Sequence, residues 1–281
     1  MNQDPTPVKP MVLRLQTVPA RHGMQWIRHG FKIFKRKPVA LSGLFSVFLF
    51  AAFVILMLPA VGVMLLLMAL PMLSLGFMLA THLVLQNLTP TAAVFLLPFK
   101  LTPERRNAQL LLCACYALAT VAISWLSESI DGGSFENLQK LAGEGAAPEQ
   151  IAEALADPQL FWGAVTRFGL AALLSIPFWH APALIHWGGH GLLQALFSST
   201  MGVWRNRAAF TVNALLWAAL VIGMSLGASL LVASLGMGQL LPMLAMPLGL
   251  LLSTVFYASL YFTFVDCFVF GAPTEPLIEK A

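Results

Sequence analysis

The stretch LSGLFSVFLFAAFVILMLP, residues 41–59, decides the fold class of this chain because it contains no charged side chain. About 20 apolar residues are enough for a helix to cross the roughly 30 Å hydrocarbon core of a bilayer. Lys and Arg tend to stay on the cytoplasmic side of an inserted helix. A basic cluster comes just before the stretch: Arg28, Lys32, Lys35, Arg36 and Lys37. Residues 41–59 are therefore predicted to be the first of several transmembrane helices, with the N-terminal side in the cytoplasm.

The composition of the whole chain agrees with a membrane protein. Of its 281 residues, 58% are hydrophobic and 10% are charged, whereas roughly 25% of the residues of a soluble domain are charged. The formal net charge is +4, with half of the Lys and Arg residues in positions 1–38 and most acidic residues in positions 128–157. This asymmetry is typical of a membrane protein with a positive cytoplasmic face. We therefore expect the phospholipid bilayer as a partner and exclude nucleic acid.

Five more apolar stretches are long enough to cross a bilayer, which predicts an all-α bundle of six transmembrane helices. They lie at residues 61–85, 107–126, 161–185, 208–235 and 240–270. An even number of spans places both termini on one side, and the internal loops on that side carry basic residues. These residues are Lys100, Arg105, Arg106, Arg205 and Arg207. The predicted domains are a cytoplasmic segment at 1–38, a membrane domain at 39–270 with an acidic periplasmic loop at about 127–160, and a cytoplasmic tail at 271–281.

Three shorter segments are predicted to lie in the plane of the cytoplasmic interface, at residues 18–34, 92–99 and 192–203. In the first, apolar side chains recur at helical spacing and basic residues occupy the other faces. The apolar positions are Met24, Ile27, Phe31 and Phe34, with Trp26 beside them. This pattern predicts that the basic cluster defined above contacts anionic lipid head groups. The alternative is a helix that only fixes the topology.

Three histidines near the cytoplasmic end of the fourth span form a candidate metal or haem site. His180, His186 and His190 are spaced so that at least two share one side of a helix, and imidazole is the commonest metal ligand. However, no carboxylate lies nearby in the sequence, and Trp179 and Trp187 alternate with the histidines. Interleaved Trp and His residues are typical of an interfacial belt. This is the weakest of the site hypotheses, and no cofactor is predicted.

One acidic residue, Asp266, lies inside a predicted span. A carboxylate in the hydrocarbon region is costly unless it is neutral, paired or next to a polar cavity. Arg205 or Arg207 is its expected partner, and the candidate polar site also includes Tyr261 and His82. Two interpretations remain open at this point: a polar cavity or proton site, and a structural pair at the end of a helix.

Small residues predict close packing elsewhere in the bundle. Gly223 and Gly227 form a G-x-x-x-G motif in the fifth span, which allows another helix to approach closely. Packing inside the bundle is the favoured interpretation, and a dimer is the alternative. The cysteines Cys113, Cys115 and Cys267 all lie in predicted spans, so we interpret them as packing residues rather than as a disulfide or a metal site.

Two motifs give this chain a family resemblance. They are GMQWIRHGFKIFKRKPVAL at residues 23–41 and FWHAPALIHW…ALFSSTMGVWRNRAAF at residues 178–210. With them the chain resembles a family of uncharacterised six-span inner-membrane proteins of beta-proteobacteria. The resemblance implies a topology but carries over no catalytic residue.

Three functional hypotheses follow from these observations. The preferred one is a non-catalytic scaffold, assembly factor or accessory subunit that associates with another membrane protein. The second is a transporter or lipid-handling protein with a polar cavity near Asp266. The third, and weakest, is a metal- or haem-binding protein that uses the three histidines.

Overall fold

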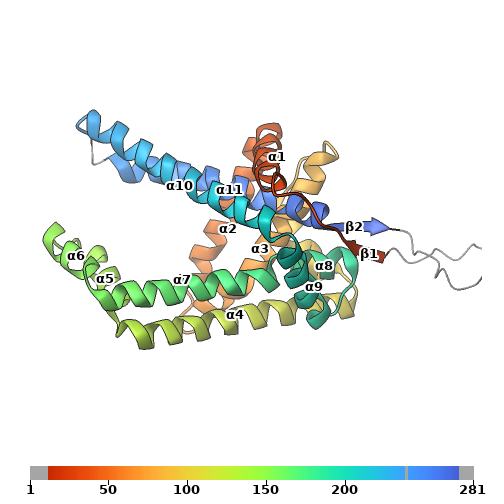
Figure 1. Cartoon of the computed structure of the whole chain (residues 1–281), viewed down its shortest axis with the longest axis horizontal. Coiled ribbons are helices and arrows are strands. Elements are labelled where there is room, and N and C mark those ends of the chain that lie inside the picture. Colours follow the sequence, from red (N-terminus) through yellow and green to blue (C-terminus); the bar gives the residue numbers. More distant parts are fainter. Residues whose placement is uncertain (1–11, 238–239, 272–281) are drawn as a thin grey trace, which may run out of the picture.

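The structure is a computed structural model that describes residues 12–237 and 240–271, and within these residues it is helical apart from two short strands (Figure 1). The N-terminal half contains β1 (Val12–Leu15), α1 (His22–Arg36), α2 (Pro38–Leu56), α3 (Gly62–Leu85), the 3₁₀ helix η1 (Ala92–Lys100), α4 (Pro103–Asp131) and α5 (Ser134–Gly143). The C-terminal half contains α6 (Pro148–Leu155), α7 (Pro158–Phe178), α8 (Ala181–Gly188), α9 (Leu192–Arg205), α10 (Arg207–Ser234), α11 (Leu241–Cys267) and β2 (Phe268–Gly271).

Six segments of the described chain are long and apolar enough to cross a membrane, which confirms the predicted fold class. They are α2, α3, α4, α7 with α8, α10 and α11. The third span is longer than predicted and extends to Asp131. The sixth ends at Cys267 rather than at position 270, because the chain continues as the strand β2.

The fourth span is broken between α7 and α8, where Pro177 and Pro182 prevent a continuous helical hydrogen-bond pattern. A helix break inside a membrane is tolerated when neighbouring groups satisfy the freed backbone atoms. Here Ser199 on α9 accepts a hydrogen bond from the His180 N–H (3.0 Å) and donates one to the Ile176 carbonyl (3.0 Å). The Gln109 amide on α4 donates to the Pro182 carbonyl (2.7 Å). The break is therefore held in place by two other helices.

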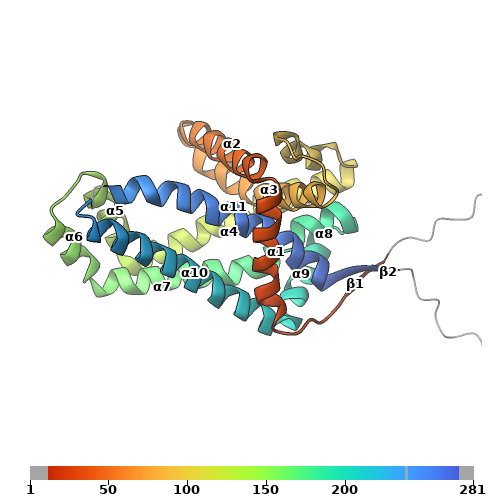
Figure 2. The same ribbon diagram turned by 90° about the horizontal axis from the view of Figure 1, so that it is seen from above.

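Helix α1 crosses over α10 and α11 instead of lying free on the lipid surface (Figure 2). Its buried positions are Gly23, Trp26, Ile27, Gly30 and Ile33. The apolar face predicted from the sequence is therefore partly wrong, because Met24 is exposed. The side of α1 that contacts the other helices instead includes Gly23 and Gly30. Glycine carries no apolar side chain, so hydrophobic spacing alone does not reveal a helix crossing that depends on close backbone approach.

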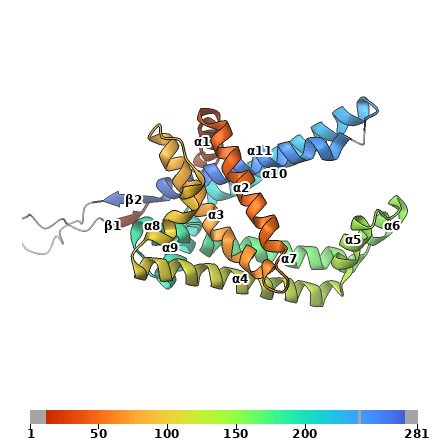
Figure 3. The same ribbon diagram turned by 180° about the vertical axis from the view of Figure 1, so that it is seen from behind.

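Two pairs of helices form arms that diverge from a common base, as Figures 1 and 3 both show. We call α4 with α7 the first arm and α10 with α11 the second arm. In the first arm, Gly163 packs against Asp131 and the Ser127 hydroxyl donates to the Gly163 carbonyl (2.8 Å). Arg167 lies 4.0 Å from the Asp131 carboxylate and over the Phe135 ring. The short helices α5 and α6 lie within the predicted acidic loop.

The two strands bring the ends of the described chain together. β1 and β2 pair in antiparallel register, with Val12 opposite Gly271 and Leu15 opposite Phe268. Nothing in the sequence pattern predicted this sheet. It places both ends of the described chain at the same end of the molecule, as an even number of spans requires.

Candidate functional site

The last turns of α11 carry polar side chains that contact three other parts of the chain. The first contact is at Asp266, whose Oδ2 accepts hydrogen bonds from His22 Nδ1 (2.7 Å) and from the Trp26 indole N–H (2.8 Å). Asp266 therefore pairs with α1, and the prediction of Arg205 or Arg207 as its partner is wrong. His22 and Trp26 are four residues apart and share one face of α1. This spacing was a signal in the sequence that an apolar interpretation of the helix overlooked.

Burial of α1 also affects a neighbouring histidine. His29 packs against the Phe262 ring of α11, with ring centroids 4.9 Å apart. Its pKa lies below the ordinary value of 6.5, chiefly because burial disfavours the charged imidazole and secondarily because Lys32 is close. His29 is therefore neutral near pH 7, which suits its position between α1 and α11.

A second contact joins α11 to α3. The Tyr261 hydroxyl lies 2.9 Å from His82 Nδ1, and the Gln86 amide nitrogen lies 3.0 Å from His82 Nε2. The Trp187 ring packs against both His82 and Tyr261. His82 and Tyr261 thus meet as members of one polar site, but Asp266 belongs to a separate contact with α1.

A third contact, between Thr263 of α11 and His180, determines which ring nitrogen of His180 carries the proton. The Thr263 hydroxyl donates its proton to the Leu260 carbonyl (2.8 Å), so it acts as an acceptor toward Trp179 Nε1 (3.1 Å) and His180 Nε2 (3.2 Å). His180 must then carry its proton on Nε2, and its buried Nδ1 has no hydrogen-bond partner. Three phenylalanine rings surround this histidine: Phe210, Phe264 and Phe268.

The other two predicted metal ligands occupy different surroundings. The His186 ring packs edge-on against Trp187, and its carbonyl accepts a hydrogen bond from Arg105 (3.1 Å). His190 lies beyond α8, where burial lowers its pKa. In the described part of the chain, no group of three or more His, Cys, Asp or Glu side chains is placed to hold a metal ion. The geometry therefore gives the metal or haem hypothesis no support.

The G-x-x-x-G motif points away from the bundle. A Cβ atom added at Gly223 or Gly227 would meet nothing within 4 Å. The favoured prediction of packing inside the bundle is therefore wrong within the described structure. Helix α10 packs chiefly against α1, α9 and α11. Only 11% of its most apolar window is buried, compared with 44% for α3, so most of this span faces its surroundings.

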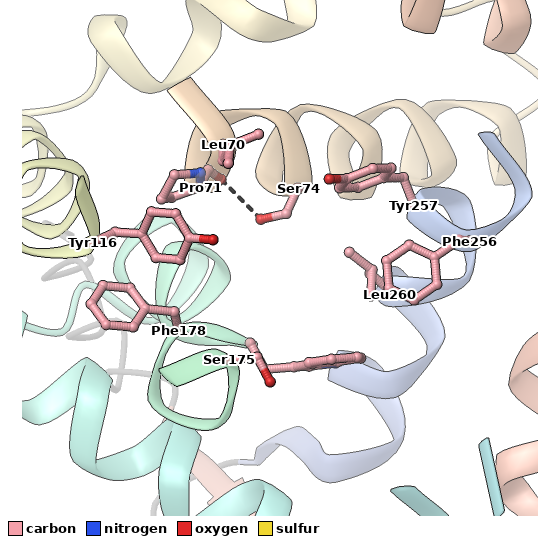
Figure 4. A pocket seen from close by; sticks show the side chains of 10 residues that line it. Leu70, Pro71, Ser74, Tyr116, Ser175, Phe178, Phe256, Tyr257 and Leu260 are labelled. Carbon is pink, nitrogen blue, oxygen red and sulfur yellow. Dashed lines mark hydrogen bonds between the residues drawn. The ribbon is translucent and has the colours of Figure 1, made fainter. Parts of the chain in front are cut away.

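A pocket of about 200 Å³ lies where the two arms meet, at the level of the middle of the spans. We call it the junction pocket; it is lined by Leu70, Pro71, Ser74, Tyr116, Ser175, Phe178, Trp179, Phe256, Tyr257 and Leu260. Figure 4 shows the hydroxyl groups of Ser74, Tyr116 and Tyr257 pointing toward its centre.

A second pocket of about 470 Å³ continues from the junction pocket along the second arm. We call it the arm pocket; it is lined by Trp217, Ala218, Val221, Leu252, Ser253, Phe256 and Tyr257. Phe256 and Tyr257 belong to both pockets. The buried indole N–H of Trp217 has no hydrogen-bond partner.

Over 270 residues the chain is 31% identical to a protein of the beta-proteobacterium Burkholderia thailandensis that is named "Probable inner membrane protein". The alignment covers 95% of this chain and 98% of that protein. The chain belongs to this family of inner-membrane proteins. No protein-family model and no solved structure matches this chain.

Asn206 is a central residue of this inner-membrane protein that the sequence analysis missed. It lies in the turn between α9 and α10, and its side chain is almost fully buried. Its Oδ1 accepts a hydrogen bond from the Val18 N–H (2.7 Å), and its Nδ2 donates to the Gln16 carbonyl (3.0 Å) and the Gly202 carbonyl (2.9 Å). One amide thus joins the N-terminal segment to the start of the fifth span.

Substitution of Asn206 with alanine is expected to destabilise the protein by about 1–3 kcal/mol, because buried backbone groups lose their hydrogen-bond partners. The measurement is the thermal unfolding midpoint in detergent. Asn107 is exposed on α4, so Asn107→Ala is the matched control and should leave the midpoint unchanged. Equal midpoints for the two variants would contradict a structural role for Asn206.

Proposed function

We propose that this inner-membrane protein is a non-catalytic accessory subunit or scaffold that binds a transmembrane helix of another membrane protein between its two arms. The observation that carries this proposal is the pair of adjoining pockets on the facing sides of the arms, which share Phe256 and Tyr257. The arms diverge toward the end of the molecule that carries α5 and α6 (Figure 1), so a helix would enter from that side or from the bilayer.

The hydroxyl groups of the junction pocket favour a protein occupant over a lipid tail. The Ser74 hydroxyl already donates to the Pro71 carbonyl (2.9 Å). The Tyr116 and Tyr257 hydroxyls lie near the middle of their spans, where acyl chains offer no hydrogen-bond partner. A polar group that faces hydrocarbon without a partner is costly. Side chains on a neighbouring transmembrane helix commonly supply such partners. An occupant with a polar residue at this depth therefore fits the pocket better than an acyl chain alone.

The open glycines of α10 lie outside the proposed binding surface. Gly223 follows Val221 of the arm pocket by two residues, so it points about 200° away from Val221 around the helix. Only 11% of the most apolar window of α10 is buried within its own chain, so a partner helix in the arm pocket would cover surface that the bundle leaves open.

Two further features are part of the proposal. We place both termini in the cytoplasm, because the basic residues gather at the end of the molecule that carries the two strands and the in-plane helices. Arg28, Lys32, Lys35 and Arg36 are exposed on α1, so these members of the basic cluster are free to contact anionic head groups. The same placement puts residues 1–38 and 271–281 in the cytoplasm, which gives the domain limits at positions 38 and 270.

The alternative of a transporter with a polar cavity at Asp266 is less well supported. The Asp266 carboxylate already accepts two hydrogen bonds from α1, which accounts for its presence in a span without a transported solute. A lipid-handling role would use the same two pockets, and the following experiment separates it from the accessory role.

The test is site-specific photo-crosslinking in cells of the source bacterium, with a benzophenone amino acid at single positions. Ser175 in the junction pocket and Val221 in the arm pocket face the proposed partner. Leu226 is exposed on α10 and is not among the residues that line either pocket, so it is the matched control. We expect both pocket positions, but not position 226, to capture the same membrane protein through one of its transmembrane segments.

Mass spectrometry of the adducts decides between the hypotheses. Capture of phospholipid alone from both pocket positions would overturn the accessory role in favour of a lipid-handling one. The same set of adducts from positions 175, 221 and 226 would show that the pockets have no specific occupant, and would also overturn the proposal.

A further inference from the structure

A separate pocket of about 350 Å³ lies at the end of the molecule where the two strands pair. It is lined by Leu13, Leu15, His190, Phe197, Ser198, Met201, Arg205 and Phe268. These residues come from β1, the segment between α8 and α9, α9 itself, and β2. One wall of the pocket is therefore apolar, and the other carries cationic and hydrogen-bonding groups.

The polar wall is suited to an anion. Arg205, in the last turn of α9, has an exposed side chain, and Arg is always charged at physiological pH. The described residues that line the pocket include no carboxylate that would neutralise it. His190 adds an imidazole whose buried Nδ1 has no hydrogen-bond partner. Ser198 adds a hydroxyl, so three different groups can donate to the oxygens of one phosphate.

The position of α9 places this pocket at the depth of lipid head groups. Leu193, Phe197 and Trp204 recur on the outer face of α9 and are 79%, 68% and 61% exposed. A helix with such an apolar outer face lies in the membrane interface with that face toward the acyl chains, and Trp is enriched at the same depth. Phe197 belongs both to this outer face and to the pocket, so the pocket adjoins the lipid.

We propose that this pocket binds one anionic phospholipid. Arg205, His190 and Ser198 donate hydrogen bonds to its phosphate, and the part of an acyl chain nearest the head group packs against Phe197 and Met201. A zwitterionic lipid fits less well, since no carboxylate of the lining receives its ammonium group. Phosphatidylglycerol therefore binds in preference to phosphatidylcholine. The site is distinct from the exposed basic residues of α1, which offer charge without a cavity.

The experiment uses the full-length protein purified in neutral detergent and titrated with short-chain phosphatidylglycerol, with bound lipid counted by native mass spectrometry. Arg205→Gln is expected to weaken binding about tenfold, because one charge-assisted contact is lost. Arg207→Gln is the matched control: Arg207 lies two positions away, is exposed, and stacks on Trp204 rather than lining the pocket. It should change the affinity less than about twofold, a difference of well under 1 kcal/mol.

Two more variants and one competition experiment test the chemistry of the site. Phe197→Gln removes the apolar wall and should weaken the binding of phosphatidylglycerol, while His190→Gln should weaken it through the loss of an imidazole contact. Inorganic phosphate in tenfold excess should not displace the lipid. Equal losses for Arg205→Gln and Arg207→Gln would overturn the proposal in favour of general surface charge. Displacement by inorganic phosphate, or no effect of Phe197→Gln, would overturn it in favour of a free phosphate ligand.

Discussion

Replacement of Asp266 with leucine is expected to release α1 from the second arm. The Trp26 indole N–H is buried, and both it and His22 donate to this carboxylate. Leucine leaves the two donors without an acceptor, and hydrogen bonds to a charged group contribute about 1.5–3 kcal/mol each. We expect a loss of roughly 3 kcal/mol in stability, since the carboxylate is only partly buried. The measurements are the thermal unfolding midpoint in detergent and the rate of trypsin cleavage after Arg28 and Lys32.

Two variants serve as controls for Asp266→Leu. Asp266→Asn keeps an oxygen acceptor and should lose less stability, with slower trypsin cleavage. Glu104→Gln removes an exposed carboxylate in the first turn of α4 and should behave like the original protein. If Asp266→Leu left α1 as resistant to trypsin as Glu104→Gln does, the carboxylate would not be what holds the helix.

Replacement of Gly23 with alanine should have the second large effect, because α1 and α10 are too close at this position to admit even one methyl group. A Cβ atom at position 23 would overlap the Ala209 carbonyl oxygen and would lie 2.7 Å from the Asn213 backbone nitrogen. Both neighbours are backbone atoms of a helix, so neither can turn away as a side chain would. Overpacking of this kind costs about 1–3 kcal/mol, and we expect the unfolding midpoint to fall accordingly.

Gly43→Ala provides the matched comparison for Gly23→Ala. Gly43 lies within α2, and a Cβ atom there would meet nothing within 4 Å. Alanine favours the helix by up to about 1 kcal/mol relative to glycine, so this variant should be at least as stable as the original. A lower midpoint for Gly43→Ala than for Gly23→Ala would refute the close crossing of α1 and α10.

The spans could be predicted from the sequence because a membrane imposes one strong rule. Backbone groups in hydrocarbon must bond within their own segment, so a long apolar stretch has little choice but to be a helix. The stretch at residues 41–59 and the basic cluster before it were therefore sufficient to predict its span. The prolines at positions 177 and 182, inside the predicted fourth span, lie on either side of the break between α7 and α8.

The contacts between distant segments could not be predicted in the same way. The bond from Trp26 to Asp266 joins residues 240 positions apart, and hydrophobic spacing within one helix carries no information about its partner. Asn206 was overlooked because a single polar residue in a turn is ordinary, although here it is buried and binds three backbone groups. The G-x-x-x-G motif predicted close packing inside the bundle, which is wrong, because a motif of small residues does not tell which side of its helix the other helices cover.

The crossing of α1 over the second arm has a consequence for biosynthesis. Helix α1 leaves the ribosome before α11, on which it rests and which is completed about 230 residues later. At roughly 5–20 residues per second, this interval is about 12–46 s. Until α10 and α11 have been made, the Trp26 face lacks the helices that cover it and must rest in the lipid surface. The basic residues on its opposite face would hold the nascent helix there until its binding surface has been inserted.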